Sequence, residues 1–172
     1  MPNWCENELR ITGPLADRQA FVNKAGEEFQ LGTFYPMPKE LEDVHDGSTT
    51  IDGIMVHHWR EIDGKQIPVD VAELQRKHGA KSWYDWSVEH WGTKWDLSEV
   101  RVLVNGRGVL YSFNTAWAPP CSGILEISKQ YPNLKFKLSY WEGGMAFQGV
   151  FIVQNGEVLS DVSGKYFGHR GG

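Results

Sequence analysis

The sequence predicts an α+β protein built on one antiparallel sheet, with two helices on one face of that sheet. Three observations support this class. Segments that alternate between apolar and polar residues lie on both sides of two amphipathic segments. Turn signals such as Gly-Pro, Asn-Gly and Gly-Gly separate these segments. The 172 residues, 41% hydrophobic and 23% charged, are enough to bury a core without disulfide or metal support.

The N-terminal part reads as a strand followed by a helix. Residues 7–12 alternate between polar and apolar side chains and end at a Gly-Pro turn. From Leu15 to Phe29, apolar residues recur at helical spacing with charged residues between them. This spacing predicts an amphipathic helix.

Regular alternation returns in the C-terminal half. Residues 100–105 and 109–117 predict two strands joined by an Asn-Gly turn, and a Pro-Pro pair opens a helix that Pro132 ends. Residues 134–141 and 146–154 predict two more strands, and a further Asn-Gly pair marks a hairpin into a short last strand. Strand–helix–strand thus occurs twice. This order is the split βαββαβ, or ferredoxin-like, arrangement with an extra C-terminal hairpin.

A long segment after the first helix interrupts this order. We expect residues 1–172 to form a single ferredoxin-like domain, with 31–99 as an inserted, Trp-rich subregion. Two prolines stop any helix near its start, and a short helix is predicted at 69–78, capped by Gly79. The insertion ends in WYDWSVEHWGTKWD at 83–96, which holds four of the eight tryptophans.

Charge and cysteine content limit the possible functions. A net charge of −5 disfavours non-specific binding to phosphate backbones. Cys5 and Cys121 are the only cysteines, which excludes a Cys-rich zinc site or an iron–sulfur cluster with several Cys ligands. The polar start and the lack of a long apolar stretch predict neither a leader nor a membrane span. We therefore expect a cytoplasmic protein with free thiols, no metal and no cofactor.

Four sequence words form a recognisable set: MPNWCENELRITG at the start, WGTKWD at 91–96, FNTAWAPP at 113–120 and YWEGGMAFQG at 140–149. Together they resemble the YubB-type family of phage and plasmid proteins with a ferredoxin-like domain, over nearly the whole chain. The family pattern often has Asn before WGTKW, where this chain has His90. The resemblance implies a ferredoxin-like fold without an iron–sulfur cluster, and an origin in a mobile element of a bacterial host. It carries no activity and no catalytic residues.

The Trp-rich stretch is the main candidate site. One interpretation is structural: its rings seal the insertion onto the open face of the sheet, against Tyr111, Phe113 or Trp117. The other is a binding surface on which bases or another flat ligand stack, with a lysine contacting phosphate. The candidate binding residues are Trp86, His90, Trp91, Lys94 and Trp95. An RNA-recognition surface on the sheet is disfavoured, because the first strand offers no aromatic residue.

Ionisable residues give two further candidates. Asp85 and Glu89 are four residues apart next to His90, and Asp96 follows; desolvation there would raise a carboxyl pKa enough for acid–base chemistry. Surface charge and helix capping are the ordinary roles of such carboxylates. A zinc site assembled from His57, His78, His90 and Asp85 would need convergent geometry, and no HExxH word is present.

We expect a non-enzymatic module that binds a protein partner through the insertion or an exposed sheet edge. Single-stranded nucleic-acid binding by the Trp-rich stretch is the alternative. An enzyme with a site near Asp85, Glu89 and His90 is the second alternative. The partner, the oligomeric state and any reaction are left open by the sequence.

Overall fold

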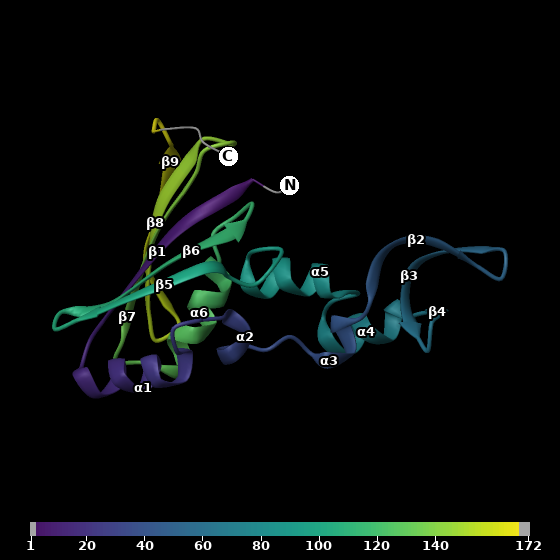
Figure 1. The fold of residues 1–172 in the computed structure, drawn as a ribbon, viewed down its shortest axis with the longest axis horizontal. Helices are drawn as coiled ribbons and strands as arrows, with labels where there is room; N and C mark the ends of the chain where they lie inside the picture. The colour runs from purple at the N-terminus through teal and green to yellow at the C-terminus, as the bar shows by residue number, and fades with distance from the viewer. Residues whose placement is uncertain (1–2, 169–172) are drawn as a thin grey trace. The chain divides into compact units, whose positions relative to one another are not determined.

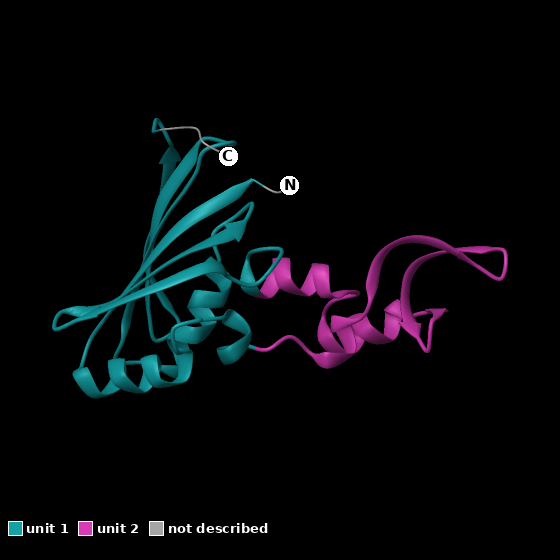
Figure 2. Ribbon diagram, viewed as in Figure 1, with its two compact units in different colours: residues 1–35, 91–172 teal, residues 36–90 magenta. Residues whose placement is uncertain are grey.

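A computed structural model of the chain describes residues 3–168 (Figure 1). Contacts group the chain into two compact units, residues 1–35 with 91–172 and residues 36–90 (Figure 2). In the described part, no helix is long and apolar enough to cross a membrane.

The first unit is built on a six-stranded sheet in the order β5-β6-β1-β7-β8-β9, with every neighbouring pair antiparallel. The strands are β1 (Trp4–Thr12), β5 (Ser98–Asn105), β6 (Gly108–Ala116), β7 (Lys135–Glu142), β8 (Phe147–Gln154) and β9 (Glu157–Lys165). Helix α1 (Leu15–Ala25) follows β1, and α6 (Cys121–Gln130) joins β6 to β7. The predicted α+β class with an antiparallel sheet is confirmed.

One face of this sheet carries the core, because alternate residues of each strand point to it. In β1, Cys5, Asn7, Leu9 and Ile11 are buried while the residues between them are exposed or nearly so. Phe21 of α1 packs on this face, with its ring centroid 6.2 Å from Tyr111 and 5.7 Å from Phe136. Figure 1 shows α1 and α6 on the same side of the sheet. The other sheet face bears the charged residues of β1.

Three elements differ from the prediction for this unit. Helix α1 ends at Ala25 rather than 29, because Gly26 adopts a φ of +66°. The last strand, β9, is nine residues long rather than short. Tyr111, Phe113 and Trp117 are expected on the open face of the sheet, whereas Tyr111 and Phe113 are buried on the helix-covered face, against Phe21 and Phe29. Trp117 follows β6 and is 43% exposed.

The second unit contains a three-stranded antiparallel sheet in the order β2-β3-β4 and several short helices. Its elements are α3 (Lys39–Glu42), β2 (His45–Ile51), β3 (Ile54–Ile62), β4 (Lys65–Pro68), α4 (Val71–His78), α5 (Trp83–Trp86) and the start of the π-helix η1 (Ser87–Trp91). Two Asp-Gly turns with positive φ, at 52–53 and 63–64, join the strands. The expected helix ending at Gly79 is present, with Asp70 as its N-cap.

The residue pattern predicts an insertion over 31–99, whereas the compact unit comprises 36–90. The difference has a clear cause at both ends. Helix α2 (Leu31–Phe34) and Leu97 belong to the first unit, where Leu31 and Leu97 are buried. The Asp96 carboxylate accepts hydrogen bonds from the backbone N–H groups of both residues.

Candidate functional site

The Trp-rich stretch divides into buried and exposed parts. Trp86 and Trp91 are 4% and 7% exposed, whereas Trp95 is 40% exposed. The Trp91 indole N–H donates to the Tyr35 carbonyl at 2.9 Å. A Cβ at Gly123 would lie 3.4 Å from the Trp91 backbone, so α6 packs closely here. Trp91 is therefore a core residue of the first unit, and its ring offers no open platform.

The acid–base candidates lie where the two helices α5 and η1 follow each other. The Asp85 backbone N–H donates to the Ser82 hydroxyl that caps α5, and Glu89 is exposed. The His90 ring stacks on Trp86, with centroids 4.7 Å apart. These contacts are those of helix capping and packing. None of the three residues lines the hollow described below.

The histidines considered for zinc have other partners. His57 Nδ1 lies 2.9 Å from the Ser48 hydroxyl, and His78 Nε2 lies 2.9 Å from the Glu40 carboxylate. Within residues 3–168, no three His, Cys, Asp or Glu side chains are grouped so that they could hold a metal ion. The structure does not assemble His57, His78, His90 and Asp85 into a site.

An exposed aromatic group forms instead at the end of the sheet where β1 begins. We call Trp4, Lys94, Trp95 and Trp117 the tryptophan cluster. The rings of Trp4 and Trp95 are 6.4 Å apart, and the Lys94 ammonium lies 4.6 Å from the Trp95 ring and 4.7 Å from the Trp117 ring. The three indoles are 39%, 40% and 43% exposed. Sequence reasoning found Lys94 and Trp95 but missed Trp4 and Trp117, which lie in the words MPNWCEN and FNTAWAPP.

Hydrogen bonds between the segments that carry these residues position the cluster. The Thr93 hydroxyl donates to the Ala116 carbonyl at 3.0 Å, which fixes WGTKW beside the end of β6. The backbone N–H of Trp117 donates to the Asn3 carbonyl at 2.9 Å, which fixes FNTAWAPP beside the start of β1. Three segments distant in sequence therefore meet at one end of the sheet.

A buried polar pair supports this end of the sheet from the core side. The Asn7 amide donates to the Thr115 hydroxyl at 2.9 Å, and that hydroxyl donates to the Ala118 carbonyl at 2.8 Å. Both side chains are almost completely buried, at 2% and 0% exposed. Buried polar groups of this kind fix one arrangement of the chain, because breaking any of the bonds leaves an unsatisfied group.

Trp117 is held in a strained backbone conformation. Its φ is +70°, in the left-handed region that a bulky residue rarely adopts. Such conformations cost about 1–3 kcal/mol and persist where the surrounding structure imposes them, often at functional sites. The strained backbone carries a tryptophan that is partly exposed to solvent.

Asp96 anchors the segment that follows Trp95. Its carboxylate accepts three backbone N–H groups, from Leu31 at 2.7 Å, Gly32 at 2.9 Å and Leu97 at 2.8 Å. Burial raises the pKa of Asp96 above its ordinary value, although the three N–H donors act in the opposite direction. This carboxylate therefore holds α2 and the cluster segment together.

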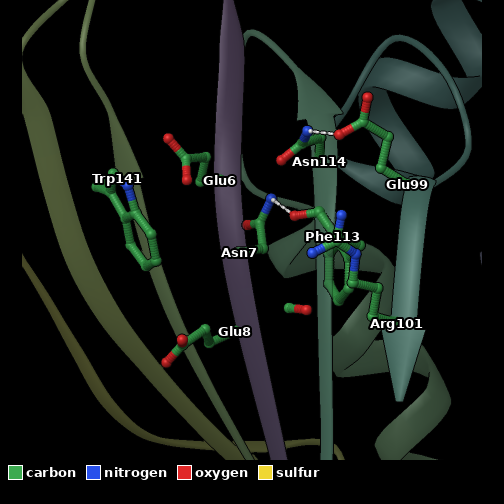
Figure 3. Close-up of a pocket in the computed structure, with 9 residues that line it drawn as sticks. Glu6, Asn7, Glu8, Glu99, Arg101, Phe113, Asn114 and Trp141 are labelled. Carbon is green, nitrogen blue, oxygen red and sulfur yellow. Dashed lines mark hydrogen bonds between the residues drawn. The ribbon is translucent and has the colours of Figure 1, made fainter. Parts of the chain in front are cut away.

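Beside the cluster, the open face of the sheet contains a polar hollow of about 230 Å³. Its charged lining residues are Glu6, Glu8, Glu99 and Arg101, and Trp141 forms one wall. Figure 3 shows Glu6 and Glu8 on the side of β1 that faces Trp141, with Glu99, Asn114 and Arg101 on the other side. After Trp4, the exposed residues of β1 are thus charged. Tyr111 and Phe113 are buried on the helix-covered face, so an RNA-recognition surface is not formed.

A β-bulge directs Glu99 into this hollow. The register of β5 on β6 shifts between Ser98 and Arg101, and Glu99 has a φ of +52°. The Asn114 amide donates to the Glu99 carboxylate at 3.0 Å across the strands. The pairing of β5 with β6 is therefore irregular at Glu99, whose carboxylate lines the same hollow as Glu6 and Glu8.

Comparison with known proteins agrees with this fold. Residues 90–168 match the family model described as "Ferredoxin-like domain in Api92-like protein". The chain carries a ferredoxin-like domain. The crystal structure of a protein api92 from Yersinia pseudotuberculosis, assigned to the family DUF1281, is similar with a TM-score of 0.60. The similarity covers 98% of this chain and 99% of that chain at 13% identity, and at this identity it shows the fold alone. No curated protein matches the chain.

The expected ferredoxin-like domain is therefore confirmed. The YubB-type assignment and the phage or plasmid origin stay predictions. So do the single-domain description and the binding roles of Trp86, His90, Trp91, Lys94 and Trp95.

Proposed function

We propose that the chain is a non-enzymatic protein-interaction module, an accessory protein of a phage or plasmid acting in the cytoplasm of a bacterial host. Its partner docks on the tryptophan cluster. The observation that carries this proposal is the meeting of three partly exposed indoles, from three separate segments, around Lys94. Tryptophan is enriched among the residues that dominate the energy of protein interfaces.

The construction of the cluster supports a role in binding. A folded protein gains stability by burying indoles, yet here the backbone at Trp117 is strained while the residue stays partly exposed. The Lys94 ammonium lies over the Trp95 and Trp117 rings, so the apolar surface of the cluster includes a positive charge. A partner that covers these rings would recover the burial that the free protein lacks.

Single-stranded nucleic acid is the second candidate, and the same cation–π arrangement favours it. Indoles stack on bases of any sequence, and a lysine beside them contacts phosphate. The nearby carboxylates of Glu6 and Glu99 and the net charge of −5 oppose this reading, because they repel a phosphate backbone. We therefore favour a protein partner.

Affinity capture with matched variants tests the proposal. The tagged full chain, Trp95→Ala, Trp117→Ala and the control Leu159→Ala are each used to capture proteins from the host lysate. Leu159 is 51% exposed on β9, so the control removes a comparably exposed apolar side chain away from the cluster. We expect one protein to be retained by the wild type and by Leu159→Ala, and to be lost with both tryptophan variants.

Two further readings make the result decisive. Circular dichroism of each variant shows whether its fold is kept. A labelled single-stranded oligonucleotide is titrated in parallel at two salt concentrations. Capture of no specific protein, or capture that both tryptophan variants retain, contradicts the proposal. Salt-sensitive oligonucleotide binding that both tryptophan substitutions remove would establish the second candidate instead.

A further inference from the structure

We infer that the docking surface continues from the tryptophan cluster onto the open face of the sheet, and that the partner is an extended segment of protein whose basic side chains enter the hollow of Figure 3. This inference rests on the proposed function and names the chemistry of the partner.

The size of the cluster requires a larger surface. With about 250 Å² for a whole tryptophan, the exposed parts of Trp4, Trp95 and Trp117 amount to about 300 Å². A specific and stable interface buries about 800 Å² on each partner. The partner must therefore cover neighbouring residues. On the β1 side, the neighbours that follow Trp4 on the same face of the strand are Glu6 and Glu8.

The charge of the hollow selects the partner. Three carboxylates, those of Glu6, Glu8 and Glu99, face one guanidinium, that of Arg101. In the part of the chain that the structure describes, neither Glu6 nor Glu8 forms an ion pair with a Lys, Arg or His side chain. The hollow therefore has an excess of negative charge that no ion pair among residues 3–168 neutralises. A lysine or arginine of the partner complements it.

Trp141 adds an aromatic wall to this negative site. Its ring lies across the hollow from β1, on the side toward which Glu6 and Glu8 point (Figure 3). Guanidinium groups stack on indole faces, and carboxylates accept two parallel hydrogen bonds from them. The combination of carboxylates with an indole fits an arginine side chain better than a small cation.

The spacing along β1 predicts the sequence pattern of the partner. Trp4, Glu6 and Glu8 alternate on one face of the strand, at intervals of about 6.7 Å. An extended segment lying along β1 repeats its own side chains at the same interval. We therefore expect the pattern apolar-x-basic-x-basic, with the apolar residue against Trp4 and the basic residues against Glu6 and Glu8.

A second copy of this chain is a weaker occupant. Arg10 and Lys137 lie further along the same face, so two copies in opposite directions would bring opposite charges together. Such an arrangement would bury many charged side chains of both copies, whereas stable homodimer interfaces are more apolar than average surface. A basic segment with few other charges avoids this cost.

The test starts from a random library of 12-residue peptides displayed on yeast. The library is selected on the full-length wild-type chain and, in parallel, on the double variant Glu6→Gln, Glu8→Gln. Both carboxylates are on exposed residues, and glutamine keeps their size, so the fold is retained. We expect selection on the wild type to enrich the pattern apolar-x-basic-x-basic, and selection on the double variant to lose it.

A synthetic peptide from the selection then gives the magnitude. Its dissociation constant is compared with that of the same peptide carrying citrulline, the neutral analogue of arginine, at both basic positions. Citrulline and the double variant should each weaken binding about tenfold or more, and added salt should weaken the arginine peptide selectively. Glu157→Gln, an exposed carboxylate at the start of β9, is the matched control and should bind like the wild type.

Three outcomes would overturn the inference. The first is enrichment without basic residues, or no enrichment. The second is equal binding of the arginine and citrulline peptides. The third is a wild-type dimer in sedimentation velocity that the double variant abolishes, because the face would then belong to a second copy. In the first two cases the proposed function is decided separately, by capture with Trp95→Ala and Trp117→Ala, so the two failures are distinguishable.

Discussion

Replacing Asp96 with alanine should destabilise the first unit far more than its place in a surface-facing turn suggests. The carboxylate accepts three backbone N–H groups at 2.7–2.9 Å. Leu31 and Leu97 are 0% and 6% exposed, so two of these donors lose their partner without gaining water. Each unsatisfied buried donor costs about 1–2 kcal/mol, so the two donors together cost about 2–4 kcal/mol. A loss of this size is a large fraction of the stability of an ordinary domain.

Equilibrium unfolding in urea, followed by circular dichroism, measures this loss. Asp96→Ala should shift the midpoint without changing the slope, which corresponds to a melting temperature about 6–12 °C lower. The stability of Asp96→Asn should lie between those of the wild type and Asp96→Ala. In this variant an amide nitrogen, which cannot accept a hydrogen bond, replaces the carboxylate oxygen that accepts the Gly32 N–H. Asp63→Asn, at an exposed turn, should stay within about 0.5 kcal/mol of the wild type. Equal stabilities of Asp96→Ala and Asp63→Asn would refute the reasoning.

Two further predictions concern other parts of the chain. In deuterated water the Trp91 indole N–H should exchange about a hundredfold more slowly than that of Trp95, because it is buried and hydrogen-bonded to the Tyr35 carbonyl. The variants Trp91→Phe and Trp95→Phe assign the two signals. Equal exchange rates would show that Trp91 is not a core residue. Hydrogen bonds from Lys77 and His78 lower the pKa of Glu40 from 4.5 to about 2. The stability that Glu40 contributes is therefore present above pH 4.5 and is lost as the pH falls toward 2. Carbon-13 titration of the carboxyl group should give a midpoint near 2 that Lys77→Ala moves toward 4.5, and an unchanged midpoint would contradict the assignment.

The class of the fold follows from local patterns, and this explains which elements were predictable. Alternation in residues 7–12 and 134–141 is visible because one sheet face is buried and the other is polar. In the second unit, β2 and β4 have no buried residue, so alternation is absent and only the two Asp-Gly turns mark the hairpins. Asp-Gly turns are strong hairpin signals in themselves, and they do not depend on the pattern of apolar residues.

The candidate site was only half visible, because its members come from three separate segments of the sequence. Trp95 and Lys94 lie in one dense stretch, whereas Trp4 and Trp117 are isolated tryptophans whose proximity depends on the pairing of β1 with β6. Local spacing also cannot tell which ring of the stretch packs on α6 and which faces solvent, so it does not separate Trp91 from Trp95. The left-handed backbone conformation at Trp117 could not be predicted either, because glycine or asparagine usually marks such a position and here the residue is tryptophan.

The division between Trp91 and Trp95 explains how one short stretch serves both folding and binding. Trp91 closes the core by its bond to the Tyr35 carbonyl, and Thr93 and Asp96 then fix the backbone on either side of Lys94 and Trp95. Lys94 and Trp95 are therefore held in place by buried neighbours, so little conformational entropy is lost when a partner binds. For the same reason, substitutions of Thr93 or Asp96 should weaken partner capture only together with stability, whereas Trp95→Ala and Trp117→Ala should weaken capture in a protein that is still folded. This separation of effects distinguishes a docking surface from an ordinary part of the core.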